Sequence, residues 1–205
     1  LATAYMDSIP LVLISGQVST HAIGSDAFQE CDVVDLAQPI SKWAYQIRSA
    51  EKIAWAVSRA FYIARSGRPG PVVLDFAKNA QTEMAEYEPR NINYIRSYEP
   101  VPPTDKESVI KAAELINEAK KPLVLVGQGV ELGNAQQEVR EFIEKADAPA
   151  GCTLLGLSAL PSNHPLNVGM LGMHGSYAAN VKTQECDLLI AIGMRFDDRI
   201  TGNLK

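Results

Sequence analysis

The stretch Pro122-Leu123-Val124-Leu125-Val126-Gly127-Gln128-Gly129 decides the fold class of this chain. A short apolar run that ends in glycines is typical of a buried parallel strand followed by a tight turn into a helix. A helix is predicted from about residue 135 to residue 145. Another precedes the strand, and its inner face is expected to comprise Val109, Ala112, Ala113 and Ile116.

The same alternation of strands and helices extends toward both ends. Further strands are predicted at residues 9–14, 70–76, 148–155 and 187–192. A helix is predicted from Ser49 to Ser66, with Ser49 as its N-cap and Gly67 as its terminating glycine. Strand–helix–strand order implies parallel sheets covered by helices, so the chain is predicted to be an α/β protein.

A polar, proline-rich stretch separates two α/β units. Residues 86–103 have no sustained hydrophobic period and are predicted to be a linker between a first domain, 1–85, and a second, 104–205. Tyr87, Tyr94 and Tyr98 suggest that the linker lies along a surface. The spacing of Thr104 and Glu107 predicts a capping box at the start of the second domain.

Composition narrows the function classes. A net charge of −5 with mixed signs argues against a general nucleic-acid or membrane surface. The three cysteines form no CxxC pair, so no zinc site or disulfide framework is predicted, and buried reduced thiols are expected. No metal site is predicted, and the motifs of serine hydrolases, zincins and P-loop NTPases are absent from the sequence.

Several turns are candidate ligand sites. Gly127 and Gly129 would let backbone N–H groups approach a phosphate at a helix N-terminus, although a turn without a ligand fits equally well. Arg68, in a rigid Gly-Pro turn, could bind phosphate or remain exposed to solvent. His174 lies between two glycines before a predicted helix, and a structural role is the alternative. Residues 193–199 follow the last strand and could either bind a ligand or pair among themselves.

Five segments, taken together and in order, resemble the catalytic subunits of acetolactate synthase, a thiamine-diphosphate-dependent family. They are AYMDSIPLVLISGQV (4–18), THAIGSDAFQE (20–30), SGRPGPVVLDFAKNAQ (66–81), LGMHGSYAAN (171–180) and MRFDDRITGNL (194–204). The resemblance covers essentially the whole chain.

This resemblance implies a fold, an activity and cofactors. Residues 1–85 would be the later part of a pyrimidine-binding domain, and 104–205 most of a Rossmann-like central FAD-binding domain. The family condenses two pyruvates, or pyruvate and 2-oxobutanoate, with loss of carbon dioxide, in branched-chain amino acid synthesis. Its cofactors are thiamine diphosphate, Mg²⁺ and FAD. The alternative is another enzyme on this scaffold, such as a pyruvate oxidase, decarboxylase or glyoxylate carboligase.

Site residues follow from the same resemblance. Phe28 and Gln29 would face the reacting centre of a neighbouring subunit, with Gln17 close by. The residues expected to contact FAD are Arg68, Gly127, Gly129, Thr153, Leu154, Leu171, His174, Gly193, Arg195 and Asp197. Those expected to line the substrate and inhibitor channel are Ser19, Lys78, Met173, Asp198 and Arg199. Many members have proline where this chain has Ser19, so weaker sulfonylurea binding is expected.

The resemblance also shapes expectations about the whole protein. Both ends look cut from a longer polypeptide, and the activating glutamate and the Mg²⁺ ligands would lie outside the chain. The 205 residues alone are therefore expected to be inactive and to hold little or no flavin. The expected assembly is a homodimer or tetramer of catalytic subunits, with a possible small regulatory subunit. The expected location is the bacterial cytoplasm, or an organelle in a eukaryote.

Overall fold

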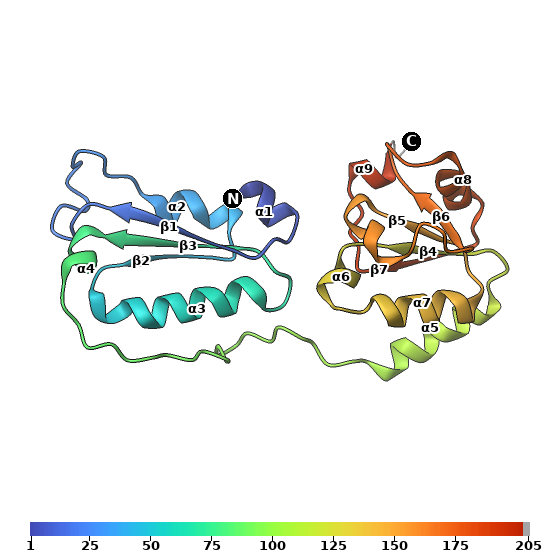
Figure 1. Ribbon diagram of the computed structural model, residues 1–205, viewed down its shortest axis with the longest axis horizontal. Helices are drawn as coiled ribbons and strands as arrows, with labels where there is room; N and C mark the ends of the chain where they lie inside the picture. Colours follow the sequence, from blue (N-terminus) through green and yellow to red (C-terminus); the bar gives the residue numbers. More distant parts are fainter. Residues whose placement is uncertain (203–205) are drawn as a thin grey trace. The chain divides into compact units, whose positions relative to one another are not determined.

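The computed structural model describes residues 1–202 and divides into two compact units, Leu1–Pro103 and Thr104–Lys205 (Figure 1). Each unit has its own parallel sheet covered by helices, which confirms the predicted α/β class. The last residues of the fifth motif, Asn203 and Leu204, lie outside the described residues.

The first unit contains a three-stranded sheet in the order β1-β3-β2. Its strands, Leu11–Gln17 (β1), Trp43–Ile47 (β2) and Pro71–Ala77 (β3), are all parallel. Helix α3 covers one face, while α1 and α2 lie over the other (Figure 1). The helical segments are Ala2–Met6 (α1), Val33–Ala37 (α2), Gln38–Ile40 (η1), Ala50–Lys52 (η2), Ile53–Arg65 (α3) and Lys78–Thr82 (α4).

The core of this unit lies between α3 and the sheet. Val72 and Leu74 of β3 are fully buried against Ala56 and Ala60 of α3. Because side chains alternate across a strand, Val73 and Asp75 face the opposite side of the same sheet. Both faces of β3 are therefore covered, as its almost wholly apolar sequence predicts.

The ends of α3 differ in part from prediction. Ser49 makes no side-chain cap; instead Glu83 Oε2 accepts the Ala50 N–H at 3.0 Å. Hydrogen bonds from Asn79 and then from the Ala50 N–H lower the pKa of Glu83. Gly67 does terminate the helix, with φ +57° just after the C-cap. The capping position was misassigned because the chain first makes a 3₁₀ turn before α3 begins.

The stretch predicted as a linker contains no helix or strand and contacts the first unit at Arg90, whose carbonyl accepts from Ser58 Oγ, at Ile95 and at Tyr98. The Tyr98 hydroxyl donates to Ser66 O at 3.0 Å, and its ring meets Tyr62 edge-on at a centroid distance of 6.3 Å. Tyr87 and Tyr94 are exposed, so the prediction of surface contact was wrong for them. Lys42 Nζ donates to Ser66 O at 2.6 Å and so supports the same corner.

The second unit contains a four-stranded parallel sheet in the order β6-β5-β4-β7. Its strands are Pro122–Val126 (β4), Ala150–Cys152 (β5), Asn167–Met170 (β6) and Leu188–Ile192 (β7). Its helical segments are Lys106–Glu118 (α5), Gly129–Leu132 (α6), Gln136–Ala146 (α7), Leu154–Ala159 (η3), Tyr177–Glu185 (α8) and Asp198–Thr201 (α9).

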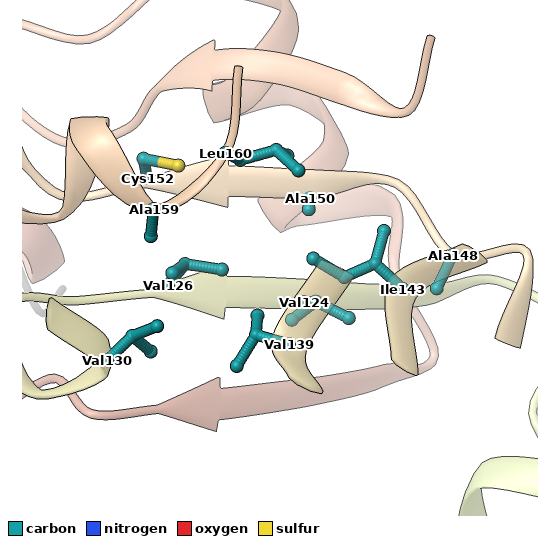
Figure 2. Close-up of a cluster of buried hydrophobic side chains, with 10 residues drawn as sticks. All are labelled: Val124, Val126, Val130, Val139, Ile143, Ala148, Ala150, Cys152, Ala159 and Leu160. Atoms are coloured by element: carbon teal, nitrogen blue, oxygen red, sulfur yellow. The ribbon is translucent and has the colours of Figure 1, made fainter. Parts of the chain in front are cut away.

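The central strand β4 is buried on both faces. Val124 and Val126 contact Val139 and Ile143 of α7 in a cluster that also includes Cys152 (Figure 2). Leu123 and Leu125 pack on the other face in a cluster with Leu171 and Ala179. Burial raises the pKa of the Cys152 thiol. Cys31 is exposed and Cys186 is half-buried, so the expected burial of all three cysteines was wrong for these two.

Helix α5 contradicts its predicted inner face. It has no buried residue, and Val109 is 56% exposed. Periodicity shows that a helix has an apolar side, but it does not show which part of a chain covers that side. The capping box was also wrong: Asp105 is the N-cap and accepts the Glu107 N–H at 3.1 Å, while Ser108 and then Glu107 lower its pKa.

One predicted strand in the second unit is shorter than expected, and one strand was missed. The predicted strand at 148–155 is a strand only over Ala150–Cys152, because the chain turns into the 3₁₀ helix η3 directly afterward. Strand β6 was not predicted. Within residues 1–202, no helix is long and apolar enough to span a bilayer.

Candidate functional site

All candidate site residues except Arg68 lie at the carboxyl ends of the strands in each unit, the edge where open α/β sheets bind ligands. We call the carboxyl ends of β1, β2 and β3, with the loops that follow them, the first carboxyl edge. The corresponding ends of β4 to β7 form the second carboxyl edge. Each edge belongs to its own unit.

The first carboxyl edge is built around Asp75, a carboxylate with 0% exposure near the end of β3. Ser15 Oγ donates to Asp75 Oδ1 at 2.7 Å, and the amides of Gln17 and Gln46 donate to Oδ2 at 3.2 and 3.0 Å. The strand register places these donors on both sides of β3. A buried charge needs such hydrogen bonds to offset its lost hydration.

The segment between β1 and α2 forms the 18–31 loop, which carries Phe28 and Gln29. Gln17 Oε1 accepts the Val18 N–H at 2.9 Å, and Gln17 Nε2 donates to Cys31 O at 2.6 Å, so one amide contacts both ends of the loop. Inside the loop, Glu30 accepts the N–H groups of Gly24 and Ala27. These two hydrogen bonds, that of Gly24 first, lower the pKa of Glu30.

The loop presents its candidate residues to solvent. Phe28 is 88% exposed, and Gln29 is exposed with a φ of +63°. Gln17, in contrast, is only 8% exposed, and its amide already bonds to Asp75, Cys31 and Val18. Gln17 therefore supports the loop, whereas Phe28 and Gln29 are available for contact with another molecule.

The other predicted residues of the first unit lie at opposite ends of its sheet. Ser19 is half-buried at the start of the 18–31 loop, and Lys78 is exposed just after β3, with its N–H donating to Val18 O at 3.4 Å. Arg68 precedes β3 and lies at the amino end, where its guanidinium donates to Ser8 Oγ at 2.7 Å and to Met6 O at 3.0 Å. The sheet thus separates Arg68 from Lys78.

Loops after all four strands of the second unit bring the remaining predicted residues to one edge. Gly127 and Gly129 follow β4, Thr153 and Leu154 follow β5, Leu171 and His174 follow β6, and Gly193, Arg195 and Asp197 follow β7. Neighbouring loops are joined by hydrogen bonds from Thr153 N to Val126 O at 2.9 Å and from Leu171 N to Cys152 O at 3.1 Å.

The glycines of this edge allow the loops to touch one another. A Cβ on Gly127 would lie 2.5 Å from Gly193 O, and one on Gly156 would lie 2.4 Å from Val126 O. The Gly127 N–H donates to Ile192 O at 2.9 Å and the Gly129 N–H to Gly193 O at 2.7 Å. These two N–H groups therefore bind protein carbonyls here, and the glycines serve close packing of backbone.

Two further loops meet at Met173 and Arg199. Met173 N donates to Arg199 O at 2.7 Å, and Arg199 Nη1 lies 3.4 Å from Met173 Sδ. Arg195 pairs with Asp197 at 3.3 Å and Arg199 with Asp198 at 3.9 Å, so the loop is self-paired at the surface. Such exposed pairs are weak and leave both guanidinium groups accessible. His174 is also exposed.

Sequence reasoning missed two hydrogen-bonded carboxylates, Asp75 at the first carboxyl edge and Asp187 at the amino end of the second sheet. Asp75 interrupts an apolar strand, a signal that was available because a carboxylate is rarely fully buried unless it is hydrogen-bonded. Asp187, just before β7, accepts the N–H groups of Lys120 and Lys121 at 2.8 Å each. These backbone hydrogen bonds, that of Lys120 first, lower the pKa of Asp187.

Comparison with known proteins finds similarity to one class of enzymes. Residues 109–205 match the family model "Thiamine pyrophosphate enzyme, central domain". The X-ray structure of a Mycobacterium smegmatis protein assigned to the thiamin diphosphate-dependent enzymes superposes with a TM-score of 0.73 at 26% identity, covering 95% of this chain and 37% of that one. The second unit is thus similar to the central domain of thiamine pyrophosphate enzymes.

The chain is also similar to acetolactate synthase large subunits. It is 45% identical to the protein of Buchnera aphidicola subsp. Schizaphis graminum over 208 residues, covering 100% of this chain and 36% of the relative. It is 44% identical to isozyme 3 of Escherichia coli strain K12 over 207 residues, again covering 100% and 36%. The chain thus spans about a third of the length of these curated relatives.

Proposed function

We propose that this chain is part of a thiamine-diphosphate-dependent acetolactate synthase. The whole enzyme would condense two pyruvates, or pyruvate and 2-oxobutanoate, with loss of carbon dioxide. The observation that carries the proposal is the similarity to acetolactate synthase large subunits at about 45% identity along the entire chain. Thiamine diphosphate, when bound, supplies the ylid and electron sink for this chemistry, which leaves orientation and environment to the protein.

The first carboxyl edge would act on the reacting centre through the 18–31 loop. Its exposed Phe28 and Gln29 offer an apolar ring and an amide in succession, suited to contact a small keto acid. By resemblance they would face the active site of a neighbouring subunit, so a dimer or tetramer of catalytic subunits is part of the proposal. Light scattering that shows only monomers of the full-length protein would contradict that part.

The second carboxyl edge would hold FAD. Leu154, Met173 and Phe196 are each more than half exposed there, and Arg195 and Arg199 lie beside them. Exposed apolar side chains next to guanidinium groups suit a ligand that has both flat rings and a pyrophosphate. Since Gly127 and Gly129 donate to protein carbonyls, we assign anion binding to the arginines. Mg²⁺ and the activating glutamate are proposed to come from elsewhere in the full-length protein.

Product analysis tests the function. The full-length protein that contains this chain is incubated with pyruvate, thiamine diphosphate, Mg²⁺ and FAD. Acetolactate is the expected product. Acetaldehyde alone would indicate a decarboxylase, and peroxide formation would indicate a flavin oxidase on the same scaffold. The 205 residues assayed alone are expected to give no turnover and little visible flavin absorbance.

A further inference from the structure

The buried carboxylate of Asp75 is connected to the 18–31 loop through a single side chain, Gln17. We infer that Asp75 is a positioning residue that fixes the base of this loop and thereby the placement of Phe28 and Gln29. The catalytic consequence rests on the proposed function, whereas the effect on the loop does not.

The first step is the orientation of the Gln17 amide. An ionised carboxylate can only accept hydrogen bonds, so the amide nitrogen of Gln17 must face Asp75. That orientation turns Oε1 toward the Val18 N–H and leaves the second N–H of Nε2 for Cys31 O. If the amide of Gln17 were flipped, its NH₂ group would face the Val18 N–H, and its oxygen would face the Cys31 carbonyl oxygen.

In the second step, the Gln17 amide bonds to both ends of the loop. Val18 and Cys31 are the first and last residues of the loop, so Gln17 closes its base from both sides. Within the loop, the Glu30 carboxylate binds the N–H groups of Gly24 and Ala27. Phe28 is 88% exposed and has little packing of its own. Its position therefore depends on these polar contacts.

Gln46, which also bonds to Asp75, offers a matched control. Gln46 donates to the same Oδ2 atom at 3.0 Å, from the opposite side of β3, and its Oε1 accepts from Arg48 Nε at 2.7 Å. Neither contact involves the 18–31 loop. Replacing Gln46 removes a hydrogen bond to Asp75 comparable with that of Gln17 while leaving both ends of the loop bonded.

The experiment compares Gln17→Met with Gln46→Met in the full-length protein by hydrogen exchange of residues 18–31. Loss of a hydrogen bond to a charged group predicts at least roughly tenfold faster exchange of the loop in Gln17→Met. Gln46→Met is expected to leave loop exchange within about twofold of wild type. Equal exchange in the two variants, or no change in either, would overturn the inference.

Substitutions at Asp75 provide the second arm. Asp75→Leu removes every acceptor and should match Gln17→Met in loop exchange. Asp75→Asn keeps one oxygen that can accept from both glutamines and should restore most of the protection. Full protection in a folded Asp75→Leu protein would contradict the inference. If that variant does not fold, loop exchange in Asp75→Asn near that of Gln17→Met would contradict it instead.

Kinetics separate this inference from the proposed function. In a protein that forms acetolactate, Gln17→Met should lower kcat by about tenfold with little change in KM, since a loosened loop misplaces Phe28 and Gln29 rather than removing substrate contacts. Unchanged kcat with faster hydrogen exchange of the loop would show that Asp75 positions the loop without affecting catalysis. A wild-type protein that forms no acetolactate would refute the proposed function and leave the exchange result standing.

Discussion

The two carboxyl edges have the same topological position and join their loops by opposite means. At the first edge, a buried side chain, Asp75, gathers donors from both neighbouring strands. At the second, the absence of side chains at Gly127, Gly156 and Gly193 lets backbone meet backbone. The first arrangement is specified by hydrogen-bond direction and the second by steric fit. The two edges should therefore respond differently to substitution.

The largest loss of stability on substitution is expected at the second carboxyl edge. Gly193→Ala places a Cβ 2.7 Å from Val130 N at a φ of +62°, which combines a backbone clash with left-handed strain. We expect a loss of about 3–5 kcal/mol in the stability of the second unit. Labelling of the buried Cys152 thiol in increasing denaturant, read by mass spectrometry, measures it.

Gly202→Ala is the matched control, because Gly202 has a φ of +61° but nothing lies within 4 Å of an added Cβ. It should cost only about 1 kcal/mol. Similar losses in both variants would show that backbone strain alone, rather than close packing of the loops, makes Gly193 necessary.

A somewhat smaller loss of stability on substitution is expected at the first carboxyl edge. Asp75→Ala leaves the buried donor of Gln17 and the half-buried donors of Ser15 and Gln46 without their acceptor, and we expect the first unit to lose about 3 kcal/mol of stability. Both tryptophans of the chain, Trp43 and Trp55, lie in this unit, so the denaturation midpoint by tryptophan fluorescence reports it. An unchanged midpoint would show that the buried carboxylate is dispensable.

Removing one donor should have a smaller effect than removing the acceptor. Ser15→Ala deletes only the 2.7 Å hydrogen bond to Asp75 Oδ1, and a loss of about 1.5 kcal/mol is expected in the same fluorescence measurement. A loss as large as that of Asp75→Ala would mean that Ser15 alone satisfies the carboxylate, contrary to a shared network.

The smallest effect concerns pH. The pKa of Glu30 is lowered below its ordinary 4.5 because the N–H groups of Gly24 and Ala27 bind its ionised form. Because the pKa of Glu30 is lower in the folded loop than in the unfolded chain, its ionised carboxylate stabilises the folded loop above pH 4.5. That stabilisation is lost as the pH falls through the pKa of Glu30 in the folded loop. Protection of residues 18–31 against hydrogen exchange, corrected for the intrinsic exchange rate at each pH, should fall in wild type as the pH is lowered below 4.5, and much less in Glu30→Gln. The same fall in protection in both proteins would exclude Glu30 as its cause.

The two edges also differ in how well sequence predicts them. Glycines after strands are visible as motifs, so the turns at Gly127 and Gly193 were found, although not their packing against each other. Strands β1, β3, β4 and β7 were predicted from apolar runs, whereas β2 and β6 lack such runs and were missed. The bonding around Asp75 depends on register between strands distant in sequence, which periodicity does not encode.

Helix α5 shows a second limit. Its apolar spacing predicted an inner face, yet no residue of α5 is buried in the described structure. Burial depends on a partner surface, and a local pattern contains no information about that partner. The same holds for the candidate residues: the sequence offered Arg68 and Lys78 as candidates, while the sheet topology showed that they lie at opposite ends of one sheet.

The proposed acetolactate synthase activity is tested most directly by its products from two keto acids. The full-length protein is given pyruvate and 2-oxobutanoate together, with thiamine diphosphate, Mg²⁺ and FAD, and the products are resolved by mass spectrometry. The proposed function predicts 2-acetolactate and 2-aceto-2-hydroxybutanoate, each formed with release of carbon dioxide. Carbon dioxide released with only aldehydes, or with peroxide and no new carbon–carbon bond, would contradict it.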